Sequence, residues 1–303
     1  MYIPPTPHGD KLNALLTNEK LPETDRPRIL EAGTLYKKWL ENLKSVSGEH
    51  RKIVIDMVDI LNEYKQYIEL NVIFDSDNNF LYRQKGQLKL DNTIIEEFLP
   101  ILLMSTLSNL FQDYDLDFGP MTCFSGIRFE SSIREDRVGG GMRFRNKDHD
   151  FAISRRLFVR SSHYEDFHSN VTEETNIAYV AAECKTNLDK TMFQEAAATA
   201  LDVKLAVPGA KYYLLCEWLD MFPISTNTTA IDEILILRKA KRLSSEVRRA
   251  FSSVEGRKEN RRKFAQYLEH NPFSAEVFLR FLDHVRKVVG ESPENDVITR
   301  GYF

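Results

Sequence analysis

The chain has 303 residues, of which 42% are hydrophobic and 28% charged, a composition typical of a folded globular protein that excludes disordered and fibrous classes. Its unbroken apolar runs, such as residues 101–104, are far shorter than the roughly 20 residues of a membrane-spanning helix, and the amino end lacks the basic flank and apolar core of a signal peptide. We therefore expect a cytoplasmic protein with no membrane partner. Three separated cysteines exclude a disulfide framework and a four-thiolate zinc site, so we expect buried thiols at Cys123, Cys184 and Cys216.

Charge is segregated along the chain, although the formal net charge is only −4. Residues 128–160 hold nine basic and five acidic side chains, residues 161–237 hold four and 12, and residues 238–263 hold 11 and three. Two basic segments therefore flank an acidic one, a pattern expected of a polyanion-binding protein with a carboxylate site. Basic runs are also common on solvated helix faces, and that interpretation stays open for each of them.

The first 78 residues predict a helical region. Apolar residues recur three and four positions apart after Pro27 and again after Glu49, a spacing that indicates two helices with one buried face each. Residues 80–90 consist of short apolar runs around Gly86, which is typical of a β-hairpin. Thr93 and Glu96 have the spacing of a capping box, so we expect a helix from Thr93 to about residue 110.

The middle of the chain changes to short strand-like runs at residues 126–129, 151–154, 157–159, 177–182, 212–216 and 234–237. Between them we expect a flexible glycine-rich loop over residues 134–150 and a helix around residues 194–201. Strands alternating with helices predict an α/β fold with a mixed central β-sheet flanked by helices. The chain then divides into an N-terminal helical region (1–78), a core (79–237) and a basic C-terminal helical region (238–303), with helix breaks near residues 256, 271 and 290.

The most informative residues are Glu183 and Lys185, at the end of an apolar strand. Alternate residues of a strand share a face, so these two side chains point the same way. Asp150 stands at the start of an apolar strand that we expect to pair beside the first. Two carboxylates at adjacent strand ends form an oxygen site that suits Mg²⁺, with Lys185 orienting or deprotonating an attacking water. The alternative is a surface salt bridge beside an ordinary loop acid.

Asp150, the strand with Glu183-Cys184-Lys185 and the following helix with Gln194 resemble the nuclease superfamily named for its Pro-Asp and Asp/Glu-X-Lys motifs, PD-(D/E)XK. The resemblance covers about residues 91–237 and is strongest to type II restriction endonucleases, in particular the BbvCI group, which cut asymmetric sites with paired subunits. It implies a sequence-specific, Mg²⁺-dependent endonuclease acting on double-stranded DNA, with residues 79–237 as the nuclease core.

The resemblance also implies roles for individual residues. Asp150 and Glu183 would be metal ligands together with the Cys184 carbonyl, and Lys185 the catalytic lysine. Glu97 or Glu96 would supply a further acid, and Gln194 would assist the site or merely cap a helical turn. His149 replaces the proline of the motif, which leaves Asp148 and Asp150 as alternatives; we favour Asp150 because it adjoins the apolar strand.

The basic segments are expected to contact DNA, through phosphates and guanine edges around residues 134–156 and through phosphates along residues 238–263. A single catalytic centre implies a homodimer or a heterodimer with a related subunit. Two other readings remain: a DNA-binding module with a non-catalytic nuclease-like core, and an interaction protein with a chance acid and lysine pair. The predicted DNA contacts are Arg134, Arg137, Arg143, Arg145, Lys147, Arg155, Arg156, Arg242, Arg248, Arg249, Arg261 and Arg262.

Overall fold

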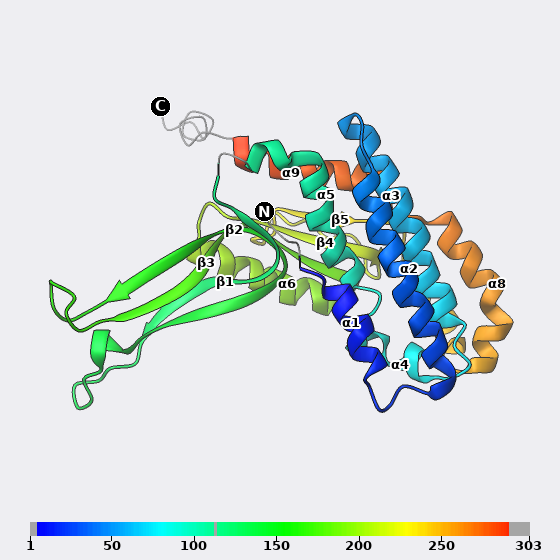
Figure 1. The fold of residues 1–303 in the computed structure, drawn as a ribbon, viewed down its shortest axis with the longest axis horizontal. Helices are drawn as coiled ribbons and strands as arrows, with labels where there is room; N and C mark the ends of the chain where they lie inside the picture. The colour runs from blue at the N-terminus through cyan, green and yellow to red at the C-terminus, as the bar shows by residue number, and fades with distance from the viewer. Residues whose placement is uncertain (1–4, 112–113, 291–303) are drawn as a thin grey trace.

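The computed structural model describes residues 5–111 and 114–290, and in this part of the chain the centre is a five-stranded sheet of order β1-β2-β3-β4-β5 (Figure 1). Neighbours from β1 to β3 are antiparallel, whereas β4 and β5 run parallel to β3, so the predicted α/β fold with a mixed sheet is confirmed. The strands are β1 (Asp117–Phe129), β2 (Met142–Ser161), β3 (Val171–Leu188), β4 (Lys211–Leu219) and β5 (Glu233–Ile236).

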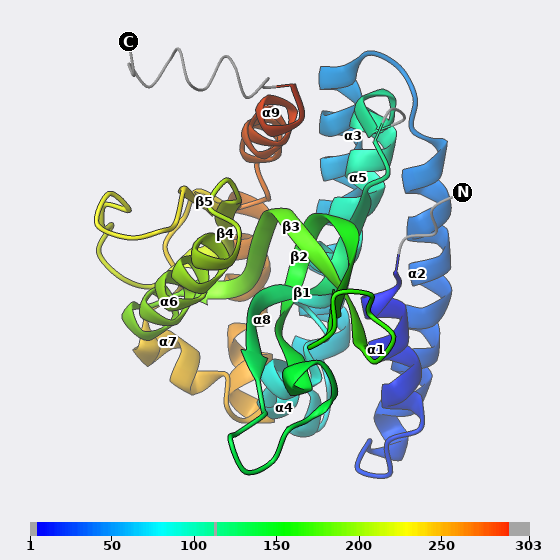
Figure 2. The same ribbon diagram turned by 90° about the vertical axis from the view of Figure 1, so that its left-hand side faces the viewer.

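Helices cover both faces of the sheet (Figures 1 and 2). On one face α6 (Lys190–Ala206) connects β3 to the parallel β4, and its alanine-rich side packs against that sheet face. The opposite face packs against α5 (Thr93–Phe111) and α9 (Ala275–Gly290). The N-terminal helices predicted after Pro27 and Glu49 are confirmed, and they pack beside α5. These elements are α1 (Pro7–Leu16), the short η1 (Glu23–Asp25), α2 (Arg26–Ser45) and α3 (His50–Gln66), which continues as the π-helical η2 (Tyr67–Phe74).

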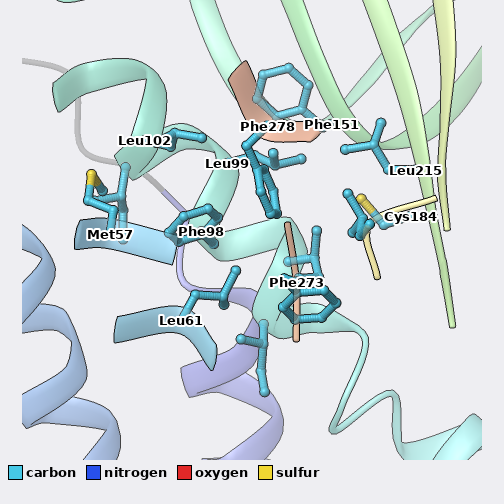
Figure 3. Close-up of a cluster of buried hydrophobic side chains, with 14 of the residues drawn as sticks. Met57, Leu61, Phe98, Leu99, Leu102, Phe151, Cys184, Leu215, Phe273 and Phe278 are labelled. Atoms are coloured by element: carbon cyan, nitrogen blue, oxygen red, sulfur yellow. The ribbon is translucent and has the colours of Figure 1, made fainter. Parts of the chain in front are cut away.

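α5 is the central helix of the hydrophobic core. Its Phe98 and Leu99 belong to one buried cluster with Leu61 of α3, Phe151 of β2 and Phe278 of α9 (Figure 3). Among the described residues α5 is the one helix long and apolar enough to cross a membrane, but 67% of its apolar window is buried inside the protein. Burial by helices on one side and the sheet on the other accounts for its composition, and α5 holds the sheet at a fixed distance from the N-terminal helices.

β1, β2 and β3 extend from the body as a bent arm (Figure 1). β2 bends so strongly that the Ser161 hydroxyl at its end donates to the carbonyl of Gly139, just before its start, at 2.9 Å. Gly139 has φ 56°, and a Cβ there would lie 2.4 Å from the Ser161 carbonyl oxygen, so the turn η3 (Val138–Gly141) is closely packed. The flexible loop predicted for residues 134–150 is wrong from residue 142 onward. There the chain pairs with β1 in a stretch whose charged side chains obscure the strand pattern.

The hairpin predicted for residues 80–90 is instead the helix α4 (Phe80–Leu88). Leu81 is fully buried in the helical core, and Lys85, one turn later, lies over the Tyr82 ring at 4.6 Å from its centroid. The residue after the helix, Lys89, has a left-handed backbone with φ 49° and ends it. The Thr93 hydroxyl donates a hydrogen bond to the Lys89 carbonyl at 2.8 Å. α5 begins at Thr93 as predicted, but this hydroxyl bonds to the preceding turn and not to the α5 backbone.

The C-terminal part contains α7 (Ser245–Ala250), α8 (Val254–His270) and α9. The helix break predicted near residue 256 lies earlier, because the Ser253 hydroxyl accepts a hydrogen bond from the Gly256 N–H at 3.1 Å and caps α8. The break at Asn271 is confirmed, since α8 ends at His270.

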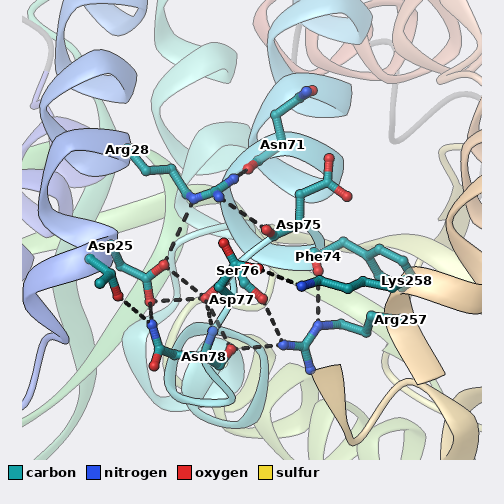
Figure 4. Close-up of polar contacts among 11 residues, drawn as sticks. Asp25, Arg28, Asn71, Phe74, Asp75, Ser76, Asp77, Asn78, Arg257 and Lys258 are labelled. Atoms are coloured by element: carbon teal, nitrogen blue, oxygen red, sulfur yellow. Dashed lines mark hydrogen bonds and ion pairs between the residues drawn. The ribbon is translucent and has the colours of Figure 1, made fainter. Parts of the chain in front are cut away.

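Two basic residues of the run 238–263 are buried. Arg257 of α8 donates to the carbonyls of Phe74 and Ser76 at 2.8 and 2.9 Å and so fixes the loop after η2 (Figure 4). Arg238 donates to Glu69 at 2.8 Å and is 6% exposed. Because both guanidinium groups are enclosed by protein, the prediction that the whole run follows DNA is wrong for these two residues.

Candidate active site

The sheet brings Asp150 and Glu183 together on neighbouring strands. Phe151 of β2 pairs with Ala182 of β3, so the two acids flank this pair on adjacent strands. Asp150 therefore lies within β2 and not at its start, because β2 begins at Met142. One Asp150 carboxylate oxygen, Oδ2, accepts a hydrogen bond from the Cys184 N–H at 2.9 Å. This bond fixes the Asp150 side chain against the strand that carries Glu183 and Lys185.

Glu183 and Lys185 form an ion pair, with Nζ 3.1 Å from Oε2. Burial raises the pKa of Glu183, but the Lys185 ammonium and the neighbouring Tyr212 and Thr199 hydroxyls lower it more, so the pKa lies below its usual value. Burial lowers the pKa of Lys185, and the Glu183 carboxylate more than reverses this effect. At neutral pH the pair is therefore a carboxylate and an ammonium.

The structure also distinguishes Asp150 from Asp148. The Asp148 carboxylate accepts a hydrogen bond from the Thr122 hydroxyl on β1 at 2.5 Å, on the arm and away from β3. His149, which stands where the motif has proline, is buried, and burial lowers its pKa. Only Asp150 of these three residues is hydrogen-bonded to the strand of Glu183.

Glu96, and not Glu97, lies beside Asp150. Burial and the Asp150 charge raise the pKa of Glu96 to about 7. Asn92 connects this acid to the site, because its amide nitrogen donates to Glu96 Oε1 at 3.1 Å and to the Cys184 carbonyl at 3.0 Å. Glu97 instead accepts hydrogen bonds from the His8 and Gly9 N–H groups of α1. The prediction of Glu97 as a metal ligand is thus wrong in its geometry.

Gln194 is exposed on α6, and it does not line the cavity described below. The groups that do lie beside Glu183 are Thr199 of α6 and Tyr212 of β4. Lys147 donates to the Thr199 hydroxyl at 2.8 Å, which ties α6 to the arm. Asn92, Thr199 and Tyr212 could not be predicted as site residues, because none belongs to a motif and each reaches the site only through packing of distant elements.

The donor set fits a divalent cation that prefers oxygen. Within the described residues, no three His, Cys, Asp or Glu side chains converge to form a metal cage. Mg²⁺ does not require one, since it commonly takes one or two carboxylates and fills its other positions with water and substrate phosphate. Asp150, Glu183 and the Cys184 carbonyl supply two carboxylates and one neutral oxygen, and the Asn92 bond orients that carbonyl.

A cavity of about 250 Å³ lies beside Asp150, Cys184 and Lys185. It is bounded by the end of β3, the segment from α4 to α5, and Arg242. Its wall carries four cations and two acids, so it suits an anionic substrate. The lining residues are Lys85, Gly86, Lys89, Asp91, Asn92, Asp150, Cys184, Lys185, Thr186, Asn187, Met192 and Arg242.

The predicted DNA contacts fall into two groups. Eight have an acidic partner: Arg137, Arg143, Arg145, Lys147, Arg156, Arg242, Arg248 and Arg261. Within residues 5–111 and 114–290, the remaining four have no ion pair, and all are exposed: Arg134, Arg155, Arg249 and Arg262.

Comparison with known proteins identifies a family and a similar fold. The sequence model of the Bpu10I restriction endonuclease family matches residues 87–303. Among solved structures, a chain of the native BbvCI A2B2 tetramer is similar, with a TM-score of 0.52 and 17% sequence identity over 86% of this chain and 96% of that chain. At this identity the likeness shows the fold alone. No curated protein matches the chain.

Proposed function

The chain belongs to the Bpu10I restriction endonuclease family, and from this premise we propose that Asp150, Glu183 and Lys185 carry out a Mg²⁺-dependent hydrolysis of DNA phosphodiester bonds. The resemblance to type II restriction endonucleases of the BbvCI group is confirmed at the level of family and fold. The observation that carries the assignment of the site is that Asp150, Glu183 and Lys185 lie together on neighbouring strands, and that Asp150 and Lys185 line a cavity with further cations.

Each residue has a distinct task in this proposal. Asp150, Glu183 and the Cys184 carbonyl would hold Mg²⁺, which when bound stabilises charge on the phosphate and lowers the pKa of water. Lys185 keeps its proton, because the pKa of its ammonium lies above the usual value. It can therefore donate hydrogen bonds to a phosphate oxygen or orient the attacking water.

A second subunit is needed to cut both strands, since one chain supplies one set of catalytic residues. The similar solved protein is an A2B2 tetramer. By analogy with it, we infer that the partner is a related but different subunit, with the homodimer as the alternative. We also propose that the protein acts in the cytoplasm, on double-stranded DNA, as expected of a restriction endonuclease family.

The test is cleavage of plasmid DNA by the protein, alone and with a candidate partner subunit. We expect cutting at defined sites with Mg²⁺, none with chelator, and a loss of about 10²–10³-fold in both Glu183→Gln and Lys185→Ala. Lys38→Ala, an exposed change on α2, is the control and should cut normally. DNA binding without cutting under every pairing would favour the non-catalytic DNA-binding module, and no binding at low salt would exclude both functions.

A further inference from the structure

Lys85 is a partly buried cation that faces the active-site cavity. It lines both this cavity and a smaller adjoining one of about 60 Å³. In the described part of the chain, no acid lies within ion-pairing distance of its ammonium, which lies over the face of the Tyr82 ring. Burial lowers the pKa of Lys85 by more than the charges of Asp91 and Glu69 raise it, and the Arg242 charge adds to the lowering.

Lys65, which is fully buried, has the polar partners that Lys85 lacks. Its ammonium lies 2.6 Å from Glu217 and 2.7 Å from the Asp91 carbonyl oxygen. Removing a cation from water is costly unless an anion or several hydrogen-bond acceptors replace the water. The fold supplies these partners to Lys65 and leaves Lys85 without them, at a wall that adjoins the catalytic residues.

Arg242 stands on the same cavity wall. Its guanidinium donates to Asp220 at 3.0 Å, and Arg248 donates to the same oxygen at 3.3 Å. This shared acid holds Arg242 in place while part of its guanidinium still lines the cavity. Of the four cations of the wall, Lys89, Lys185 and Arg242 each have an acidic partner, Asp150, Glu183 and Asp220, whereas Lys85 has none among the described residues. Lys85 is therefore the cation left to bind a phosphate in addition to the one being cut.

We propose that Lys85 and Arg242 form a second phosphate-binding subsite, which holds a backbone phosphate flanking the scissile one. The inference rests on the proposed function and adds a substrate contact to it. Lys85 is then a positioning residue, because a phosphate fixed one step along the strand sets which phosphodiester faces Lys185. Its ammonium is assigned to a DNA phosphate and not to free phosphate ion, since the cavity is continuous with the catalytic strands.

The experiment measures binding of a short duplex that carries the sequence cut in the plasmid assay, with Ca²⁺ in place of Mg²⁺ so that cleavage does not interfere. Each phosphate around the cut is replaced in turn by a neutral methylphosphonate. We expect wild type to lose about tenfold in affinity at one flanking position, the size of one charge-assisted hydrogen bond. Lys85→Gln should lose affinity on unmodified DNA and show a clearly smaller further loss than wild type at that position, because only Arg242 still contacts the phosphate, whereas Lys85→Arg should bind like wild type.

Lys38→Gln on α2 is the matched control and should keep the full position-dependent loss. The proposal is overturned if Lys85→Gln binds unmodified DNA as tightly as wild type, or if it shows the same losses as wild type at every position. It is also overturned if inorganic phosphate binds wild type and Lys85→Gln differently while DNA does not. Glu183→Gln separates the two proposals, because it should keep the methylphosphonate pattern and lose only cleavage.

Discussion

Glu96 and Glu97 are neighbours on α5 but belong to different parts of the molecule. Glu96 accepts a hydrogen bond from the Asn92 amide, which also donates to the Cys184 carbonyl. Glu97 accepts hydrogen bonds from backbone N–H groups of α1 and, at 2.6 Å, from the Tyr36 hydroxyl. Adjacent residues on a helix point about 100° apart, so a single acid on the right face serves the site. The sequence left the choice open because the face of α5 toward the sheet depends on packing that no local pattern records.

Glu96→Gln and Glu97→Gln should therefore behave differently. We expect Glu96→Gln to weaken Mn²⁺ or Ca²⁺ binding by about 10-fold, as found when a group that orients a metal ligand is altered. Glu97→Gln should keep metal affinity and lower the free energy of unfolding by about 1–3 kcal/mol, because α1 loses a charged acceptor. Calorimetric metal titration and urea unfolding measure the two effects. Weakened metal binding in Glu97→Gln alone would contradict this assignment.

His8 makes the docking of α1 sensitive to pH. Its Nε2 lies 2.7 Å from the Tyr64 hydroxyl, and burial followed by the Lys65 charge lowers its pKa from 6.5 to about 3. Between these values the unfolded chain binds a proton that the folded chain excludes, so the free energy of unfolding falls as the pH falls, by about 1.4 kcal/mol per unit.

From pH 7.5 to 5.5, wild type should thus lose about 1.4 kcal/mol more than His8→Gln, since only the last unit lies below the unfolded pKa of His8. Urea unfolding at both pH values measures this difference, and the carboxylates that titrate in both proteins cancel. An equal loss in the two proteins would show that His8 is accessible to protons in the folded state.

At the scale of elements, alternation and periodicity identified the helices that bury one face and the strands β4 and β5, which are mostly apolar. They failed for α4 and for the first half of β2. Nine residues around Gly86 fit a hairpin or a helix equally well, and burial of Leu81 among helices decides for the helix. β2 is charged where it enters the arm, and the bonds that define it join segments far apart in the chain, such as Thr175 to Asn146.

The start of α8 offers a test of close packing between elements. A Cβ on Gly256 would lie 1.8 Å from the Ala250 carbonyl oxygen at the end of α7, so Gly256→Ala must displace backbone. We expect a loss of about 1–3 kcal/mol in the free energy of unfolding. Gly33→Ala in α2 is the matched control, since nothing lies within 4 Å of its added methyl group, and there alanine should stabilise by about 0.5–1 kcal/mol. Thermal unfolding of both variants, measured side by side, checks the opposite signs.

At the scale of the whole molecule, ion pairing reduces the positive charge that the basic segments can offer to DNA. Most of the predicted DNA contacts are already matched by an acid, and Arg238 and Arg257 are enclosed. The segment charges of the sequence therefore overstate the positive charge available to a phosphate. Within the described residues, the cations without an ion pair at the predicted positions are Arg134, Arg155, Arg249 and Arg262. Outside the active-site cavity, DNA affinity should depend on these positions and not on net charge.

Two variants with equal net charge test this. Changing those four arginines to Gln takes the formal charge from −4 to −8, and so does changing four exposed lysines near α2, Lys20, Lys37, Lys38 and Lys44. In Ca²⁺, the arginine variant should show a shallower dependence of log affinity on log salt, by about 0.9 for each arginine that contacts a phosphate. The lysine variant should keep the wild-type slope, because its charges lie on the outer helices. Equal slopes in the two variants would mean that long-range charge, and not contact, governs DNA binding.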